Sequence, residues 1–168
     1  VCGIDHDSVN PPKERKSIGV SRTFDPIVDR EEMKRRIMIL CRHLSYTVRK
    51  YGFTPTTFGM YIRYEFSARA KGNIKSNRLF SEKRFIDEMI TLFERIDTYP
   101  TFYIRSISIT TGSFIHQTRK GTSLICFEED KKIEQFDQKL HQVRQKYGLD
   151  VLKWGSEMSD NSRVISSR

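Results

Sequence analysis

The sequence predicts an α+β domain: a four-stranded antiparallel sheet with two helices on one face, followed by a separate C-terminal helix. Three observations support this fold class. Segments that alternate apolar and polar residues, as half-buried strands do, recur through residues 15–114. Two segments with apolar residues three and four apart, as in amphipathic helices, lie between them. The order is β-α-β-β-α-β, and each helix has one apolar stripe. We therefore expect both helices on the same side of the sheet and an open, polar face on the other.

The first strand is expected from Arg15 to Phe24. Ile18 and Val20 alternate with small polar residues such as Ser17 and Ser21, so one side of the strand is apolar and the other polar. Cations at its start and hydroxyls along its open side suit contact with a phosphate backbone.

The first helix is expected to run from Arg30 to Tyr51. Asp29 is a good N-cap residue, and Glu32 three residues later completes a capping-box pattern. Gly52 stands where a left-handed C-terminal cap is usual. The apolar stripe of this helix consists of Met33, Ile37, Leu40, Cys41, Leu44, Val48 and Tyr51.

A cation-rich hairpin is expected next. Its first strand, Phe53–Phe66, alternates cleanly, and Ile74–Phe80 returns as the third strand of the sheet. The pair Gly72-Asn73 favours a turn within Ser67–Asn73. No acid interrupts the cations of this hairpin, which are Arg69, Lys71, Lys75 and Arg78.

Ser81 is expected to cap a second helix that runs to about Asp97, and Thr101–Phe114 forms the fourth strand. The apolar residues of this strand change phase near Arg105-Ser106, which a β-bulge would explain. Beyond the change of phase, the outward residues are Ser106, Ser108 and Thr110.

Beyond the sheet, residues 115–128 are expected to be irregular and residues 129–155 to form a final helix and a short apolar coda. The helix, Glu129–Tyr147, has a narrow apolar stripe suited to packing on one neighbour. Gly148 ends the helix, and residues 156–168 are expected to form a disordered tail. The apolar stripe consists of Ile133, Phe136, Leu140, Val143 and Tyr147.

The 168-residue chain has a net charge of +9 and a pI of about 9.6, which favours a polyanionic partner such as nucleic acid. No apolar run approaches the roughly 20 residues needed to cross a bilayer, and the N-terminus lacks a signal-peptide pattern, so no membrane partner is expected. Cys2, Cys41 and Cys126 are far apart, which indicates a reducing compartment, no disulfide framework and a core thiol at Cys41.

No pattern in the sequence indicates a catalytic or metal site. The histidines are scattered without metal-ligand spacing, and no glycine-rich phosphate loop precedes a helix. Catalysis with two metal ions needs carboxylates that hold divalent cations, whereas acids such as Asp87-Glu88 are typical of solvated helix starts. We therefore expect this chain to be non-catalytic by itself and to bind no cofactor.

The stretch from Lys16 to Phe24 has the form Lys-Ser-Ile-Gly-x-x-x-Thr-Phe. It resembles the strand that opens the little-finger domain of Y-family (translesion) DNA polymerases of the ImpB/MucB/SamB and DinB/UmuC group. The resemblance implies a reversed ferredoxin-like arrangement over residues 16–114, with residues 1–15 as the linker from the thumb. It also implies a parent DNA polymerase that uses Mg²⁺, acts in DNA repair and the SOS response, and is cytoplasmic and nucleoid-associated in a bacterium.

The same resemblance implies that the open sheet face and the hairpin grip the backbone of a template-primer DNA duplex. Lys and Arg side chains meet phosphates while hydroxyls and backbone amides supply neutral donors, so the duplex is positioned without its sequence being read. The candidate DNA-backbone residues are Lys16, Ser17, Arg63, Lys71, Lys75, Arg78, Ser106 and Ser108.

A second candidate contact is Ser123–Phe127, which resembles the Gln-Leu-x-Leu-Phe peptide that docks bacterial polymerases on the sliding clamp. Leu124 and Phe127 match the two apolar anchors of that peptide, whereas Ser123 replaces the Gln and Cys126 the second Leu. A short apolar segment folded back on the domain is an equally good interpretation.

Two other functions fit parts of the sequence. Stand-alone RNA-binding modules share the β-α-β-β-α-β order, but they stack bases on paired aromatic residues, and Tyr61 is the one aromatic residue expected on the outward side. A protein-interaction scaffold that acts through the last helix is the third interpretation.

Overall fold

The computed structural model describes residues 16–115 and 127–158, and it confirms the α+β fold class. The β-α-β-β-α-β order is the expected one, and a third helix follows it. The elements are β1 (Ser17–Ile27), α1 (Arg30–Lys50), β2 (Thr54–Tyr64), β3 (Arg69–Lys75), α2 (Glu82–Ile96), β4 (Ile104–Ile115) and α3 (Phe127–Tyr147). Short 3-10 turns are η1 (Glu65–Ser67), η4 (Leu149–Val151) and η5 (Gly155–Glu157).

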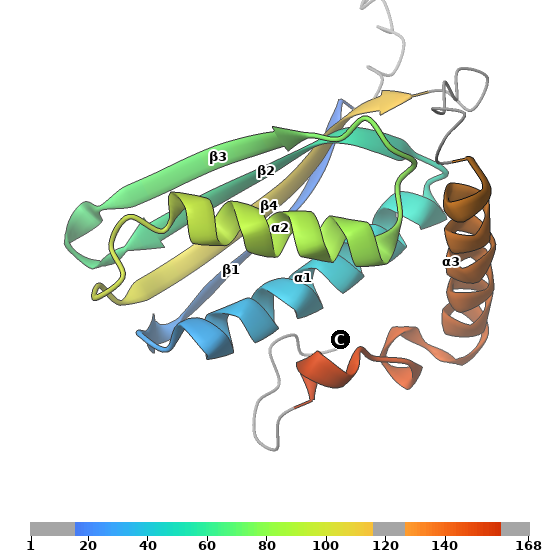
Figure 1. The fold of residues 1–168 in the computed structure, drawn as a ribbon. Helices are drawn as coiled ribbons and strands as arrows, with labels where there is room; N and C mark the ends of the chain where they lie inside the picture. The colour runs from blue at the N-terminus through green and yellow to red at the C-terminus, as the bar shows by residue number, and fades with distance from the viewer. Residues whose placement is uncertain (1–15, 116–126, 159–168) are drawn as a thin grey trace, which may run out of the picture.

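The four strands form one antiparallel sheet in the order β1-β4-β2-β3, with β1 and β3 at its edges. Because each neighbouring pair is antiparallel, β1 is parallel to β2 and β3 is parallel to β4. Each helix therefore crosses over one intervening strand. Both α1 and α2 lie on the same face of the sheet (Figure 1), and no element among the described residues covers the opposite face.

The hydrophobic core lies between the sheet and the two helices. Cys41 of α1 belongs to it, as expected: it is a free thiol without solvent exposure, and burial raises its pKa. The other core members are fully or almost fully buried side chains from both layers and include Met33, Ile37, Leu40, Leu44, Phe58, Ile62, Phe85, Met89, Leu92, Ile107 and Ile109.

Both helices begin after the expected N-cap residues, but the capping box expected at α1 is not formed, because the Glu32 carboxylate pairs with Arg35 and Arg36 and the Asp29 side chain bonds to the Glu31 amide and not to that of Glu32. The Asp29 carboxylate accepts a hydrogen bond from the Glu31 amide at 3.0 Å and caps α1. The Ser81 hydroxyl accepts one from the Arg84 amide at 3.2 Å and caps α2. Gly52, with φ +72°, has the left-handed backbone expected just after α1.

The expected β-bulge in the fourth strand is present. Arg63 and Tyr64 of β2 pair with Ser106 and Ile104 of β4, so Arg105 is the extra residue. The bulge shifts the phase of β4, so that Ile104 before it and Ile107 and Ile109 after it are all buried, while Ser106 and Ser108 lie on the outward side.

The third strand lies earlier in the chain than expected, and the expectation of Ile74–Phe80 is wrong. β3 spans Arg69–Lys75, and the hairpin turn is made by Phe66 (φ 53°) and Ser67 (φ 62°). These residues have the left-handed backbone that usually favours glycine. The true turn therefore carries no glycine or proline signal in the sequence.

Gly72 lies inside β3 rather than in the turn. A Cβ atom at this position would be 2.7 Å from Ile96 Cγ2 and 2.9 Å from Leu92 Cδ1, both on α2. Real Cβ atoms do not come this close to carbon, so the glycine allows α2 to pack tightly on the edge strand. A packing glycine and a turn glycine look the same in the sequence.

The last helix docks through a different face from the one expected. Phe136 and Tyr147 of the expected apolar stripe are 56% and 63% exposed. The buried residues of α3 are instead Asp130, Asp137 and Arg144, which are spaced seven residues apart. The expectation of apolar packing is therefore wrong. Helix α3 stands across one end of the helix layer (Figure 1).

The buried charges of α3 are matched by groups on α1 and α2. Asp137 accepts hydrogen bonds from the Arg49 guanidinium at 2.6 Å and from the Glu82 amide at 2.9 Å. Arg144 donates to the Glu82 carboxylate at 2.6 Å. Truncating one member of such a buried pair leaves the other charge without compensation, so these contacts hold α3 in one position.

The chain stays structured beyond the expected start of the tail. Glu157 in η5 is 3% exposed, and its carboxylate accepts a hydrogen bond from Arg42 Nε at 2.8 Å. The expectation of disorder from residue 156 is wrong as far as Met158, and residues 159–168 lie outside the described residues. Within residues 16–115 and 127–158, no helix combines the length and apolar character that crossing a bilayer requires.

Candidate nucleic-acid interface

The open face of the sheet is a regular array of outward side chains, because neighbouring strands pair in register. Rows about 7 Å apart, two strand residues, cross the sheet from β1 through β4 and β2 to β3. No acidic residue belongs to these rows. They are Ser17-Gly112-Thr57-Lys75, Gly19-Thr110-Gly59-Asn73, Ser21-Ser108-Tyr61-Lys71 and Thr23-Ser106-Arg63-Arg69.

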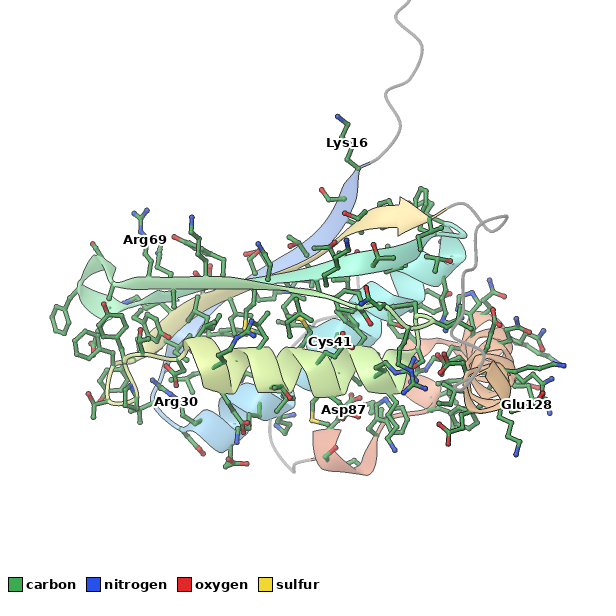
Figure 2. All side chains as sticks on the ribbon, turned by 45° about the horizontal axis from the view of Figure 1, so that its top comes forward. Lys16, Arg30, Cys41, Arg69, Asp87 and Glu128 are labelled. Atoms are coloured by element: carbon green, nitrogen blue, oxygen red, sulfur yellow. The ribbon has the colours of Figure 1, made fainter. Side chains whose placement is uncertain are left out.

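The array has a cationic half and a hydroxyl half. Arg69, Lys71 and Lys75 lie exposed along the edge strand β3, with Arg63 beside them on β2. Strands β1 and β4 contribute serine, threonine and glycine residues. Arg69 and, next to the start of β1, Lys16 project from the same side of the sheet, away from α1 and α2 (Figure 2). The face thus combines charged and neutral donors to an anion.

The cations of this face are not balanced by acids. Arg63 and Arg69 occupy directly opposed positions of β2 and β3, where like charges repel and cost sheet stability. Within the described part of the chain, neither of them forms an ion pair, and nor do Lys71 and Lys75. A bound polyanion would neutralise this repulsion.

Arginines of the helix layer are in a different situation. Arg30 pairs with Asp97 at 2.7 Å, and Arg42 pairs with Glu157 at 2.8 Å. These guanidinium groups are largely buried and stabilise the packing of the helices and turns. The arginines of the sheet face, by contrast, are available to a ligand.

At Gly59, in the middle of the array, no side chain projects from the sheet. A Cβ atom there would be 2.7 Å from Asn73 Oδ1 and 2.7 Å from Thr110 Oγ1. The Asn73 amide and the Thr110 hydroxyl therefore lean over the glycine from its two neighbouring strands. Tyr61, 36% exposed, lies in the next row and is the aromatic residue of the array.

The structure brings most of the predicted DNA-backbone residues together. Lys16 directly precedes β1 and projects from the open side (Figure 2). The members of the array itself are Ser17, Arg63, Lys71, Lys75, Ser106 and Ser108.

Arg78 is the predicted residue that the structure places elsewhere. It lies in the segment after β3, and its guanidinium donates to Asp130 of α3 at 2.7 Å. Arg84 donates to the same carboxylate at 3.0 Å. Burial opposes ionisation, but these two hydrogen bonds lower the pKa of Asp130. Because the third strand ends at Lys75, the Arg78 charge helps to dock α3 and does not belong to the open face.

Arg69 and Asn73 belong to the array but were not among the predicted contacts. A signal for them exists in the sequence: polar residues alternate with Ala70, Gly72 and Ile74 through this stretch. The expectation of a turn at Gly72-Asn73 hid this alternation.

The candidate clamp peptide stays a prediction. Leu124 lies outside the described residues, and Phe127 is the first residue of α3.

Comparison with known proteins gives the class to which this fold belongs. A solved Y-family DNA polymerase chimera matches 61% of this chain and 30% of its own, with 16% identity and a TM-score of 0.51. A solved complex of the beta-clamp processivity factor and the little finger domain of PolIV matches 64% of this chain and 97% of its own, with 15% identity and a TM-score of 0.49. This chain therefore has the fold of one part of a Y-family DNA polymerase.

The family follows from the sequence comparison. Residues 15–124 match the impB/mucB/samB family C-terminal domain, and the chain belongs to this family. Proteins named DNA polymerase IV from Staphylococcus aureus strains JH9 and Newman are each 28% identical to it over 127 residues. The match covers 74% of this chain and 35% of each relative, so the chain spans about a third of the length of these bacterial relatives.

Proposed function

We propose that the open sheet face binds the sugar-phosphate backbone of DNA without reading its sequence, as the little finger of a translesion DNA polymerase that grips template-primer duplex. The observation that carries this proposal is the acid-free array, in which the cations of β2 and β3 have no ion-pair partner among the described residues. Charge neutralisation of phosphates supplies most of the affinity in such binding.

The two halves of the array suit two kinds of contact. Lys71 and Lys75 are two rows apart on the edge strand, so they reach different phosphates of one DNA strand. The serine and threonine hydroxyls of β1 and β4 are carried by short side chains, and they donate neutral hydrogen bonds to phosphate oxygens. No base-reading geometry is involved, which is what a domain that follows a moving polymerase needs.

The remaining functions belong to the longer protein that we infer around this domain. Its palm would hold Mg²⁺ with carboxylates and carry out nucleotide transfer, in the bacterial cytoplasm at the nucleoid and within the DNA-repair and SOS responses. This part of the proposal rests on membership of the impB/mucB/samB family and on relatives named DNA polymerase IV.

RNA binding is the second candidate, because Tyr61 offers one stacking surface at the centre of the array. RNA-recognition modules use at least two stacked aromatics, and the rows contain one. DNA-backbone binding therefore fits the array better. Docking on a sliding clamp rests on Leu124 and Phe127 alone, and loss of clamp binding in the Leu124→Ala/Phe127→Ala variant would support it.

Fluorescence anisotropy with a labelled primer-template duplex, a single strand and an RNA hairpin, each over a salt series, tests the proposal. We expect the duplex to bind best and Lys71→Ala/Lys75→Ala to reduce the salt slope by about two units. Lys50→Ala/Lys139→Ala removes the same charge from the helices and is the matched control. Equal slopes for the two double variants would contradict the proposal, and tightest binding of the RNA hairpin would favour the RNA interpretation.

A further inference from the structure

A pocket of about 390 Å³ lies between the start of α2 and the middle of α3, on the helical side of the domain. It is distinct from the open sheet face, and nothing in the proposed DNA contact uses it. Among the residues that line it are Lys83, Asp87, Lys132, Ile133, Phe136 and Trp154.

The pocket has an apolar floor. Ile133 and Trp154 are half-buried, and Phe136 is 56% exposed. Trp154 Nε1 already donates to the Glu82 carboxylate at 2.8 Å, so the polar edge of the indole is satisfied and the rest of the ring is apolar surface. This floor would gain by burying one apolar side chain of a partner.

The rim of the pocket is positive overall. Lys83 and Lys132 are exposed on its two sides, and Asp87 is the exposed acid among the lining residues. The charge of Asp137 is matched by Arg49. The pocket also lies at the N-terminus of α2, where the helix dipole favours a carboxylate.

The exposed charges of the pocket argue against a second copy of this chain as the occupant. Lys83 and Lys132 are the exposed cations that line it, and Asp87 is the exposed acid. Two copies docked through the pocket would bring these lysines together, whereas an acidic partner would find complementary charge. A DNA backbone would find the lysines but has no apolar group for the floor.

We propose that this pocket binds an acidic peptide segment of another protein, with one apolar side chain seated on Ile133, Phe136 and Trp154. Flanking carboxylates of the segment pair with Lys83 and Lys132. The contact would connect the helical side of the domain to a protein partner while the sheet face is occupied by DNA.

The chain contains a single tryptophan, so the intrinsic fluorescence of Trp154 reports on the pocket directly. The probe is the peptide Asp-Glu-Asp-Phe-Glu-Asp-Leu-Glu-Asp, compared with the same peptide in which Ser replaces Phe and Leu. We expect the first peptide to shift the emission of Trp154 to shorter wavelength, with binding about fivefold weaker for Lys132→Glu and for Phe136→Ala. Lys139→Glu and Tyr147→Ala make the same changes on α3 outside the pocket, and both should bind like the unmodified chain.

Three results would overturn the proposal: equal binding of the serine peptide, equal losses in the control variants, or a Trp154 shift caused by a short DNA duplex and abolished by Lys132→Glu. The last result would make the pocket a nucleic-acid contact. Lys71→Ala/Lys75→Ala should leave peptide binding unchanged, so failure of the DNA proposal and failure of this one are separable.

Discussion

Gly72 sets how closely α2 approaches the edge strand β3. Its missing side chain faces Leu92 and Ile96, and Leu92 has no solvent exposure. We expect Gly72→Ala to destabilise the domain by about 1–3 kcal/mol through overpacking, measured by urea unfolding. Gly155→Ala is the matched control, because no atom lies within 4 Å of a Cβ placed there. Equal stability of the two variants would show that α2 can move away from the sheet at little cost.

His43 makes the stability of the domain depend on pH. Burial and, to a lesser extent, the neighbouring Arg42 lower the pKa of His43 to about 4. The unfolded chain binds this proton near pH 6.5, so between these values the unfolded state holds more protons than the folded state. Stability should therefore be highest above about pH 6.5 and fall as the pH is lowered towards 4.

Urea unfolding of the unmodified chain and of His43→Gln, at about pH 7.5 and about pH 5, checks this expectation. The unmodified chain should lose more stability between the two pH values than the variant does. Other titrating groups contribute to both proteins and cancel in the comparison. An equal loss in the two proteins would mean that His43 is protonated in the folded state.

At the scale of elements, α3 is held by charge and not by its apolar stripe. The Asp137 carboxylate accepts hydrogen bonds from the guanidinium of Arg49 on α1 and from the backbone amide of Glu82, the first residue of α2. We expect Asp137→Ala to cost about 3–5 kcal/mol, because Arg49 and the Glu82 amide lose their acceptor. Undocking of α3 should also expose Trp154 and move its emission to longer wavelength.

The variant Tyr147→Ala tests whether α3 docks through its buried charges or through its apolar stripe. Tyr147 is 63% exposed, so its truncation should change stability by less than about 0.5 kcal/mol. If instead Tyr147→Ala destabilised the chain as much as Asp137→Ala, the apolar stripe would be the docking surface after all.

Which elements could be predicted depended on local signals. The caps at Asp29 and Ser81 and the phase change at Arg105 are short-range patterns, and each marks a real feature. Packing between elements far apart in the sequence was harder to predict from such local patterns. Gly72 is explained only by a helix twenty residues further along the chain, and the burial of Asp130, Asp137 and Arg144 depends on partners in α1, α2 and the loop after β3.

At the scale of the whole molecule, charges are separated by function. Ion pairs such as Arg42–Glu157 and Arg144–Glu82 lie among the helices and turns, while the open face has cations and no acid in its rows. A net charge of +9 indicates a polyanionic partner but not the surface that meets it. The alternation of polar and apolar residues along the strands located most of that surface. Arg78 was misplaced because its partner, Asp130, lies on an element whose packing the sequence does not reveal.

The most direct measurement is an amide chemical-shift map of the ¹⁵N-labelled chain titrated with a primer-template duplex. Binding through the sheet predicts the largest shifts at Ser17–Thr23, Arg69–Lys75 and Ser106–Thr110, with little change along α1 and α3. The shift changes in these three segments should decrease together as salt is added. Largest shifts along α3, or at the pocket lined by Lys83 and Lys132, with the sheet unaffected, would contradict the claim that the open face binds DNA.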